Sequence, residues 1–158
     1  MAWHPDRRAR AWLLVVVVAA VVLGLDQLTK HLVEESIPRG EERSFLPGIQ
    51  LVDTRNRGVA FGFLPSHQTV VTILIGAALV FLLIYFARHT AVPAIWLPTG
   101  MLIGGALGNI IDRSRHGSVT DFIKLPLGWP PFNIADAAIT LGILILLIVI
   151  EQRRPRPQ

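Results

Sequence analysis

Four long apolar stretches, separated by polar segments, dominate the pattern of this 158-residue chain. They cover approximately residues 12–33, 69–86, 94–112 and 134–150. A helix needs about 20 predominantly apolar residues to cross the hydrocarbon core of a bilayer. The pattern therefore predicts an all-α membrane protein with four transmembrane helices, built as one domain.

The first apolar stretch allows two interpretations. Residues 12–25 carry no charge and follow a basic start, which is also typical of a cleavable signal peptide. No clean small-x-small cleavage site follows, and three more apolar stretches do, so a span that continues through Asp26 to Val33 is favoured. Lys30 lies one turn after Asp26, and we expect its ammonium to extend outward to water. Asp26 is then either half of a structural pair with Lys30 or a support for a functional site.

The longest polar segment, residues 34–66, is rich in prolines and glycines. Residues 49–63 mix β-branched and aromatic side chains with turn formers, which predicts short strands. A segment this long exceeds what a connection between spans requires. We expect a small extracytoplasmic, β-rich platform between the first and second spans, lying on the membrane surface. That position would bury Phe45, Leu46, Ile49, Phe61 and Phe63.

Glycines mark the third apolar stretch. Gly100, Gly104 and Gly108 recur every four residues, a small-xxx-small pattern that allows close helix contact in lipid. Helix packing within the chain explains them fully. A scaffold that binds another membrane protein through this face is an alternative, but it leaves the acidic residues of the chain unexplained.

The charge distribution predicts the orientation. The net charge is +4, and Lys and Arg are dense in both terminal segments and in the turn at residues 87–92. By the positive-inside rule both termini are cytoplasmic, and residues 34–66 and 113–132 face outward. Because the basic residues flank apolar stretches, membrane lipids are the expected partner, and nucleic acid is not.

Two Asn-x-x-Asp repeats stand where the third stretch ends and the fourth begins. Asn109 precedes Asp112 by one helical turn, and Asn133 precedes Asp136 by the same spacing. Antiparallel spans would bring both aspartates to the outer membrane surface. The alternative is a pair of solvated carboxylates at helix ends, where the first turn favours Asp136 in any case.

Two close carboxylates share one proton, so the ionised member can activate water while the neutral member donates a proton. That chemistry is peptide hydrolysis of the aspartic type. Asn109 and Asn133 could orient the aspartates, and Arg113 could pair with Asp121 in the outer loop. The chain has no cysteine, its five histidines form no zinc-binding pair, and it has only two lysines, so no metal or cofactor is expected. A proton-coupled transporter is the competing interpretation, but it would favour polar groups near the midplane.

Five short segments also resemble a known family. They are DQLTK at 26–30, NRGVAFG at 56–62, GNIIDR at 108–113, VTDFI at 119–123 and FNIADAAIT at 132–140. In this order they are similar to the signature segments of lipoprotein signal peptidase, the bacterial signal peptidase II. Val59 departs from the alanine that many members carry at that position.

The resemblance implies an aspartic endopeptidase of the bacterial cytoplasmic (inner) membrane. It would remove the signal peptide from diacylglyceryl-modified prolipoproteins, on the N-terminal side of the lipidated cysteine. Asp112 and Asp136 match the catalytic pair. Supporting or substrate-contacting positions are matched by Asp26, Asn56, Asn109, Arg113, Asn133 and Ala135. One site within four helices makes a monomer sufficient.

Overall fold

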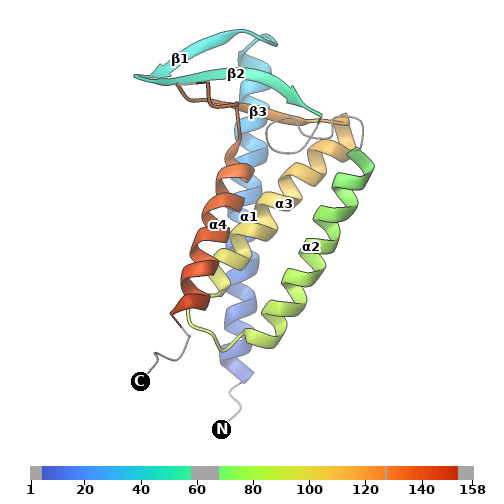
Figure 1. Ribbon diagram of the computed structural model, residues 1–158, viewed down its shortest axis with the longest axis vertical. Coiled ribbons are helices and arrows are strands. Elements are labelled where there is room, and N and C mark those ends of the chain that lie inside the picture. The colour runs from blue at the N-terminus through green and yellow to red at the C-terminus, as the bar shows by residue number, and fades with distance from the viewer. Residues whose placement is uncertain (1–4, 58–67, 127, 153–158) are drawn as a thin grey trace.

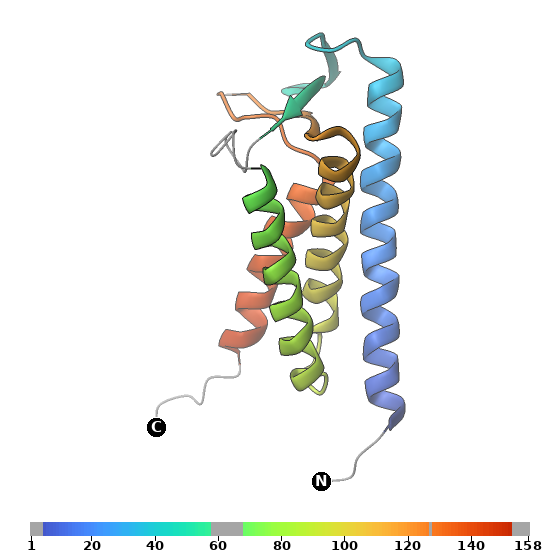
Figure 2. The ribbon, with the colours of Figure 1, turned by 90° about the vertical axis from the view of Figure 1, so that its right-hand side faces the viewer.

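The computed structural model describes residues 5–57, 68–126 and 128–152, and within them the chain is mostly helical with one small sheet (Figure 1). The elements follow one another as α1 (Pro5–Ser36), β1 (Glu42–Leu46), β2 (Ile49–Asn56), α2 (Gln68–His89), α3 (Trp96–His116), β3 (Val119–Lys124) and α4 (Ile134–Glu151). The helices form an elongated bundle, and the sheet covers one end of it (Figures 1 and 2). α1 begins and α4 ends at the opposite end.

Each predicted span corresponds to one of these helices, with differences at the ends. α1 extends beyond the predicted 12–33 in both directions. α3 continues a full turn past Asp112 and stops at Gly117, whose left-handed backbone (φ 64°) lets its N–H donate to the Arg113 carbonyl. Asp112 therefore lies within a helix rather than at its last residue, and its side chain faces neighbouring elements.

The sheet is antiparallel, in the order β1-β2-β3. Of the strands predicted at residues 49–63, β2 is present, and residues 58–63 lie outside the described part of the chain; β1 belongs to the same segment but precedes the stretch where strands were predicted. The third strand, β3, comes from the segment between α3 and α4 and was not predicted. It is anchored where Phe122 packs against Val33 and Ile37 at the end of α1. The sheet thus connects the two segments that separate the spans.

The apolar side chains expected to need burial are only partly described. Phe45 and Leu46 on β1 are 62% and 52% exposed. Phe61 and Phe63 lie outside the described residues, as does most of the NRGVAFG segment at 56–62. The exposed pair gives β1 an apolar surface, which is compatible with contact to a membrane.

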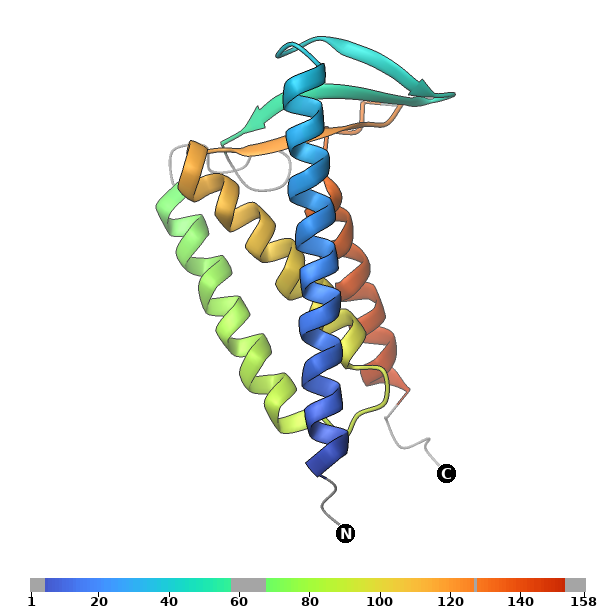
Figure 3. The same cartoon turned by 180° about the vertical axis from the view of Figure 1, so that it is seen from behind.

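α3 packs closely against both α1 and α4, and its glycines make this possible. A Cβ added to Gly104 would lie 2.6 Å from the Ala19 carbonyl oxygen of α1, and one added to Gly105 would lie 2.6 Å from the Ala135 carbonyl oxygen of α4. The predicted small-residue face at Gly100, Gly104 and Gly108 therefore packs within the chain. Figure 3 shows α3 crossing between its neighbours.

Three of the described helices are long and apolar enough to cross a membrane: Arg7–Ser36, Thr72–His89 and Ile134–Glu151. α3 is less apolar because glycines and Asn109, Asp112 and Arg113 occupy much of its length. Two of these polar residues, Asn109 and Asp112, are buried against neighbouring elements. The apolar composition of the described helices thus supports three spans. The packing of α3 against its neighbours explains why it is less apolar than the other helices.

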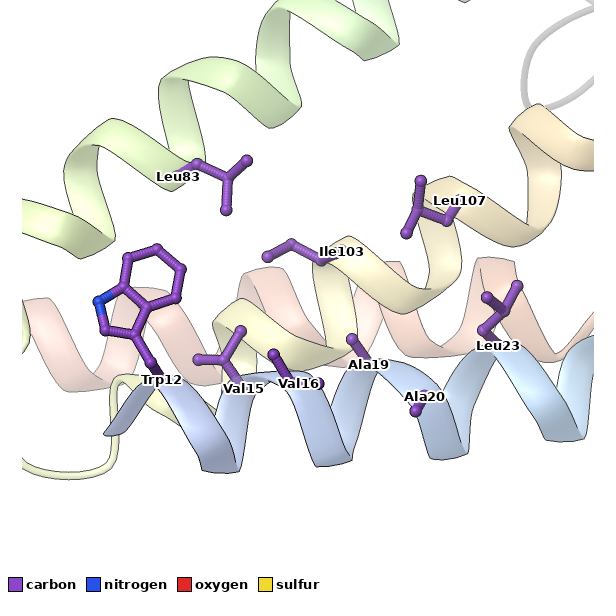
Figure 4. A pocket seen from close by; sticks show the side chains of 9 residues that line it. All are labelled: Trp12, Val15, Val16, Ala19, Ala20, Leu23, Leu83, Ile103 and Leu107. Atoms are coloured by element: carbon purple, nitrogen blue, oxygen red, sulfur yellow. The ribbon is translucent and has the colours of Figure 1, made fainter. Parts of the chain in front are cut away.

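α2 leaves an apolar groove beside α1. Trp12 meets Phe86 edge-to-face, with ring centroids 4.8 Å apart, where α1 and α2 approach each other. Farther along, side chains such as Leu23, Leu83 and Leu107 line the space between α1, α2 and α3 (Figure 4). Its lining is apolar, so hydrocarbon suits this groove better than water does.

Candidate functional site

Polar side chains from α1, α3, β3 and the start of α4 meet beneath the sheet. The α1 contribution comes from residues 26–30 and the α3 contribution from residues 109–113. Asn133 and Asp136 open α4, and Asp121 lies on β3. Segments far apart in the sequence thus converge at the end of the bundle where the sheet lies (Figure 2).

A buried lysine lies at the centre of the cluster. Lys30 Nζ is 2.7 Å from Asp26 Oδ2 and 2.8 Å from Asp112 Oδ2, and it donates to Asn109 Oδ1 at 3.1 Å. The Asp26–Lys30 pair is therefore present, but the expectation that Lys30 extends to water is wrong, since its side chain is only 3% exposed. Two carboxylates and one amide oxygen replace the water that its ammonium would otherwise need.

Asp26 also fixes the start of α4. Its second oxygen, Oδ1, accepts from the backbone N–H of Ala135 at 2.9 Å. Ala135 is fully buried, and its Cβ lies close to Gly108 of α3. A larger side chain at Ala135 would therefore push α3 and α4 apart. Asp26 and Ala135, both predicted as supporting residues, act together in the structure.

Asp112 is held by three donors. Besides Lys30, the side-chain amide of Gln27 donates to Oδ1 at 2.9 Å, and the backbone N–H of Thr120 donates to Oδ2 at 3.2 Å. The Asp112 residue is 4% exposed. Both of its carboxylate oxygens are thus engaged by the protein, as expected of a structural ion pair.

Asn133 orients Asp136 within its own Asn-x-x-Asp repeat, and Asn109 orients Asp136 from the other repeat rather than its own neighbour Asp112. Asn109 Nδ2 donates to Asp136 Oδ1 at 2.8 Å. Asn133 is the N-cap of α4, and its Oδ1 accepts from the backbone N–H of Asp136 at 2.8 Å. Arg113 donates to the Asn109 carbonyl oxygen at 3.3 Å. Asp136 is only half-buried, which leaves part of it open to a ligand.

Asp121 is connected to Asp136 through Asn133. Asn133 Nδ2 donates to Asp121 Oδ1 at 2.7 Å, and Asn56 Nδ2 donates to Asp121 Oδ2 at 3.0 Å. Burial and, secondarily, the negative charge of Asp136 raise the pKa of Asp121 to about 7, although both amide donors oppose this shift. A carboxyl group with a pKa near neutrality beside a second carboxylate is suited to proton transfer.

The structure thus brings together all the predicted site residues, but it adds four more. Gln27, Lys30, Thr120 and Asp121 contact them directly. Asp121 was predicted only as a partner of Arg113; its charge does act on Arg113, and its carboxylate also accepts hydrogen bonds from Asn133 and Asn56. Gln27, Lys30, Thr120 and Asp121 all lie in segments that carried the family resemblance, and for Gln27 and Thr120 this was the only signal in the sequence.

Comparisons with known proteins identify the family of the chain. Residues 18–151 match the model of the family described as Signal peptidase (SPase) II. A lipoprotein signal peptidase of Halothermothrix orenii is 36% identical over 141 residues, covering 89% of this chain and 97% of the relative. One from Syntrophomonas wolfei is 42% identical over 131 residues, covering 82% and 87%.

Solved structures give the same result for the fold. A bacterial membrane enzyme solved at 2.3 Å resolution superposes with a TM-score of 0.84 at 28% identity, covering 91% of this chain and 93% of that one. A second, solved at 1.9 Å, gives a TM-score of 0.80 at 30% identity, with 89% and 94% covered.

Proposed function

Since the chain belongs to the signal peptidase II family, it is an aspartic protease that removes signal peptides from prolipoproteins, and we propose that Asp121 and Asp136 form its catalytic pair. The observation that carries this pairing is Asn133, which holds both residues at once: its amide nitrogen donates to Asp121 and its oxygen caps Asp136. The negative charge of Asp136 also contributes to the raised pKa of Asp121.

The pair can divide the chemistry of peptide hydrolysis. Asp121, with its pKa of about 7, holds the shared proton at neutral pH. Asp136 is the ionised member and takes a proton from the attacking water. Asp121 polarises the scissile carbonyl and then gives its proton to the leaving amine. Asn109 keeps the Asp136 carboxylate directed toward the site.

The sequence pattern paired Asp136 with Asp112 instead, and that pairing remains a prediction. The contacts favour Asp121 over Asp112, because Asp112 is ion-paired with Lys30 and also accepts from Gln27 and Thr120. A carboxylate engaged on both oxygens must break these contacts before it can exchange protons with a substrate. Asp112 is better suited to fixing α3 against α1 and β3.

The remaining predicted residues support the pair. Asp26 and Ala135 fix the start of α4, and Asn109 and Asn133 orient Asp136. Asn56 holds the far oxygen of Asp121. Arg113, near the end of α3, is placed to contact a peptide substrate. No step in this scheme requires a metal or a cofactor.

We propose that the chain crosses the bacterial inner membrane four times, with α3 as the fourth spanning element and both termini cytoplasmic. The sheet then lies at the outer surface as the predicted platform, with Phe45 and Leu46 against lipid. The support is that α1 begins and α4 ends at the end of the bundle away from the sheet (Figure 1). Reporter fusions near Gly117 and after Gln158 should read external and cytoplasmic, respectively, and the reverse result would contradict this orientation.

The substrate we propose is a prolipoprotein whose cysteine carries diacylglycerol. A site at the outer edge of the bilayer lets the acyl chains stay in lipid while the peptide bond reaches the carboxylates. Each buried methylene contributes about 0.8 kcal/mol, so two chains supply much of the binding free energy. The purified enzyme should therefore cleave diacylated precursor at least about 100-fold faster than unmodified precursor. Equal rates would remove the lipid from recognition.

The raised pKa of Asp121 predicts how cleavage depends on pH. We expect the rate to fall as pH rises through about 7, because Asp121 then loses the proton that it donates to the leaving amine. The measurement is kcat/KM on a diacylated peptide across roughly pH 5 to 9, at constant ionic strength. A rate that stays flat across the pKa of Asp121 would contradict its role as the acid.

The raised pKa of Asp121 also predicts how the stability of the fold depends on pH. The folded pKa of Asp121 lies above its ordinary value of 3.8. Its contribution to the free energy of unfolding is therefore fully present below a pH of 3.8 and is lost as pH rises through about 7. The variant Asp121→Asn should show a flatter dependence of melting temperature on pH over this interval.

A further inference from the structure

Thr120 is a fully buried residue that connects several elements immediately before Asp121. Its backbone N–H donates to Asp112 Oδ2 of α3 at 3.2 Å. Its carbonyl oxygen accepts from Asn133 Nδ2 at 3.2 Å, the same amide group that donates to Asp121. The backbone on the N-terminal side of Asp121 is therefore held both to α3 and to the start of α4.

The Thr120 hydroxyl makes a second set of contacts that the proposed chemistry does not use. It donates to Glu34 Oε1 of α1 at 2.6 Å and accepts from an Arg55 guanidinium nitrogen of β2 at 2.6 Å. Arg55 and Glu34 are themselves 3.0 Å apart, so the three side chains form a closed network. Arg55 and Glu34 are mostly shielded from water, at 17% and 28% exposure. Shielding from water strengthens such contacts relative to those on an open surface.

The strand ladder alone does not fix the position of Asp121. The β2–β3 register shifts between Leu51 and Thr54, so the regular pairing is interrupted next to the pair Thr54–Asp121. An irregularity of this kind leaves a residue unpaired and bends the strand locally. The ladder holds Asp121 on one side only, so its position also depends on side-chain contacts: the Thr54 hydroxyl donates to the Asp121 carbonyl oxygen at 2.9 Å, and the contacts made by Thr120 are adjacent to it.

We propose that Thr120, held by Arg55 and Glu34, is a positioning residue that sets Asp121 opposite Asp136. This inference rests on the proposed pairing of these two aspartates. Thr120 does not touch the reacting atoms. Its hydroxyl contacts fix β3 to α1 and β2, and its backbone transmits that position to the neighbouring carboxylate. The network thus couples the outer sheet to the geometry of the catalytic pair.

The test compares Thr120→Val with Thr120→Ser. Valine has nearly the shape of threonine but lacks the hydroxyl, whereas serine keeps it. A displacement of about 1 Å at a catalytic group costs up to about 100-fold in rate. We expect Thr120→Val to lower kcat about 10- to 100-fold with KM changed less than about twofold, and Thr120→Ser to retain most of the wild-type kcat. The assay is cleavage of a diacylated prolipoprotein, with a melting curve for each variant.

Thr99→Val is the matched control. Thr99 is also fully buried, but its hydroxyl bonds to the Ile95 carbonyl within its own helix turn, away from the sheet. It should leave kcat unchanged. If Thr120→Val does not fold, Arg55→Lys is tested in its place. Lysine keeps the positive charge beside Glu34 but lacks the guanidinium group that contacts both Glu34 and Thr120. Arg55→Lys should then lower kcat to a similar extent.

Two outcomes would overturn the inference. One is an unchanged kcat in Thr120→Val or Arg55→Lys. The other is a loss in Thr120→Val that Thr120→Ser does not restore. The cleavage rate of the Asp121→Asn variant is measured in the same assay for comparison. If Asp121→Asn itself cleaves normally, the proposed catalytic pair fails. If it is inactive while Thr120→Val is fully active, only the positioning role fails.

Discussion

Asp136→Asn should lower the rate of prolipoprotein cleavage by at least about 10³-fold, and Asp121→Asn should have an effect of the same size. Asparagine keeps the volume and most hydrogen bonds of aspartate but cannot transfer the proton. Members of one catalytic unit fail together, so the double variant should be scarcely slower than either single one. The measurement is a mobility-shift assay on diacylated prolipoprotein, with a melting curve to show that each variant is folded.

Asp112→Asn distinguishes the two candidate pairs. If Asp112 has a structural role, this variant should keep measurable cleavage and the same fall in rate near the pKa of Asp121, while its melting temperature drops because Lys30 loses one partner. Glu35→Gln, at an exposed residue near the end of α1, is a control for the chemical change. An inactive but stable Asp112→Asn beside an active Asp121→Asn would instead support the pairing that the sequence pattern predicted.

Lys30→Met should destabilise the fold far more than the loss of an exposed charge does. Methionine fills a similar volume but leaves Asp26 and Asp112 buried without their shared cation. Removing one partner of a buried ion pair costs about 3–5 kcal/mol. For a domain of this size that corresponds to a melting temperature lower by on the order of 10 °C, measured in detergent.

Lys124→Met provides the matched comparison. Lys124 pairs with Glu42 across the sheet, and both side chains are about one-third or more exposed. Exposed pairs contribute about 0–1 kcal/mol, so this variant should melt within a few degrees of the parent. Adding Asp112→Asn to Lys30→Met should recover part of the lost stability, because it removes one of the unpaired charges. Equal melting temperatures for Lys30→Met and the parent would show that the central ion pair does not stabilise the fold.

The sequence predicted the helices well and the sheet only in part. Long apolar stretches have one stable form in lipid, since a helix satisfies every backbone hydrogen bond internally. β2 lies in the stretch where β-branched residues and turn formers predicted strands, whereas β1 precedes that stretch and pairs with β2 as a hairpin. β3 could not be predicted in this way, because its six residues become a strand only through pairing with β2, from which they are far removed in sequence.

For the site, the sequence identified the right segments but not the contacts between them. The Asn-x-x-Asp spacing correctly placed Asn133 beside Asp136, but it did not show that Asn109 contacts Asp136 from the neighbouring helix. It gave no information about what faces Asp112, which is Lys30. A helical period tells which residues share a face, whereas the partner opposite that face depends on helix packing. Lys30 was expected in water for the same reason, since only the assembled bundle shows that Asp26 and Asp112 enclose it.

The polar composition of α3 has a consequence for how the protein is made. In the proposed four-span arrangement, α3 must enter the bilayer although Asn109, Asp112 and Arg113 make it a poor substrate for insertion on its own. The glycine face of α3 and the Lys30 that neutralises Asp112 both require α1, which is synthesised first. Insertion of α3 is therefore a cooperative event that follows α1, so substitutions on α1 can act by leaving α3 outside the membrane.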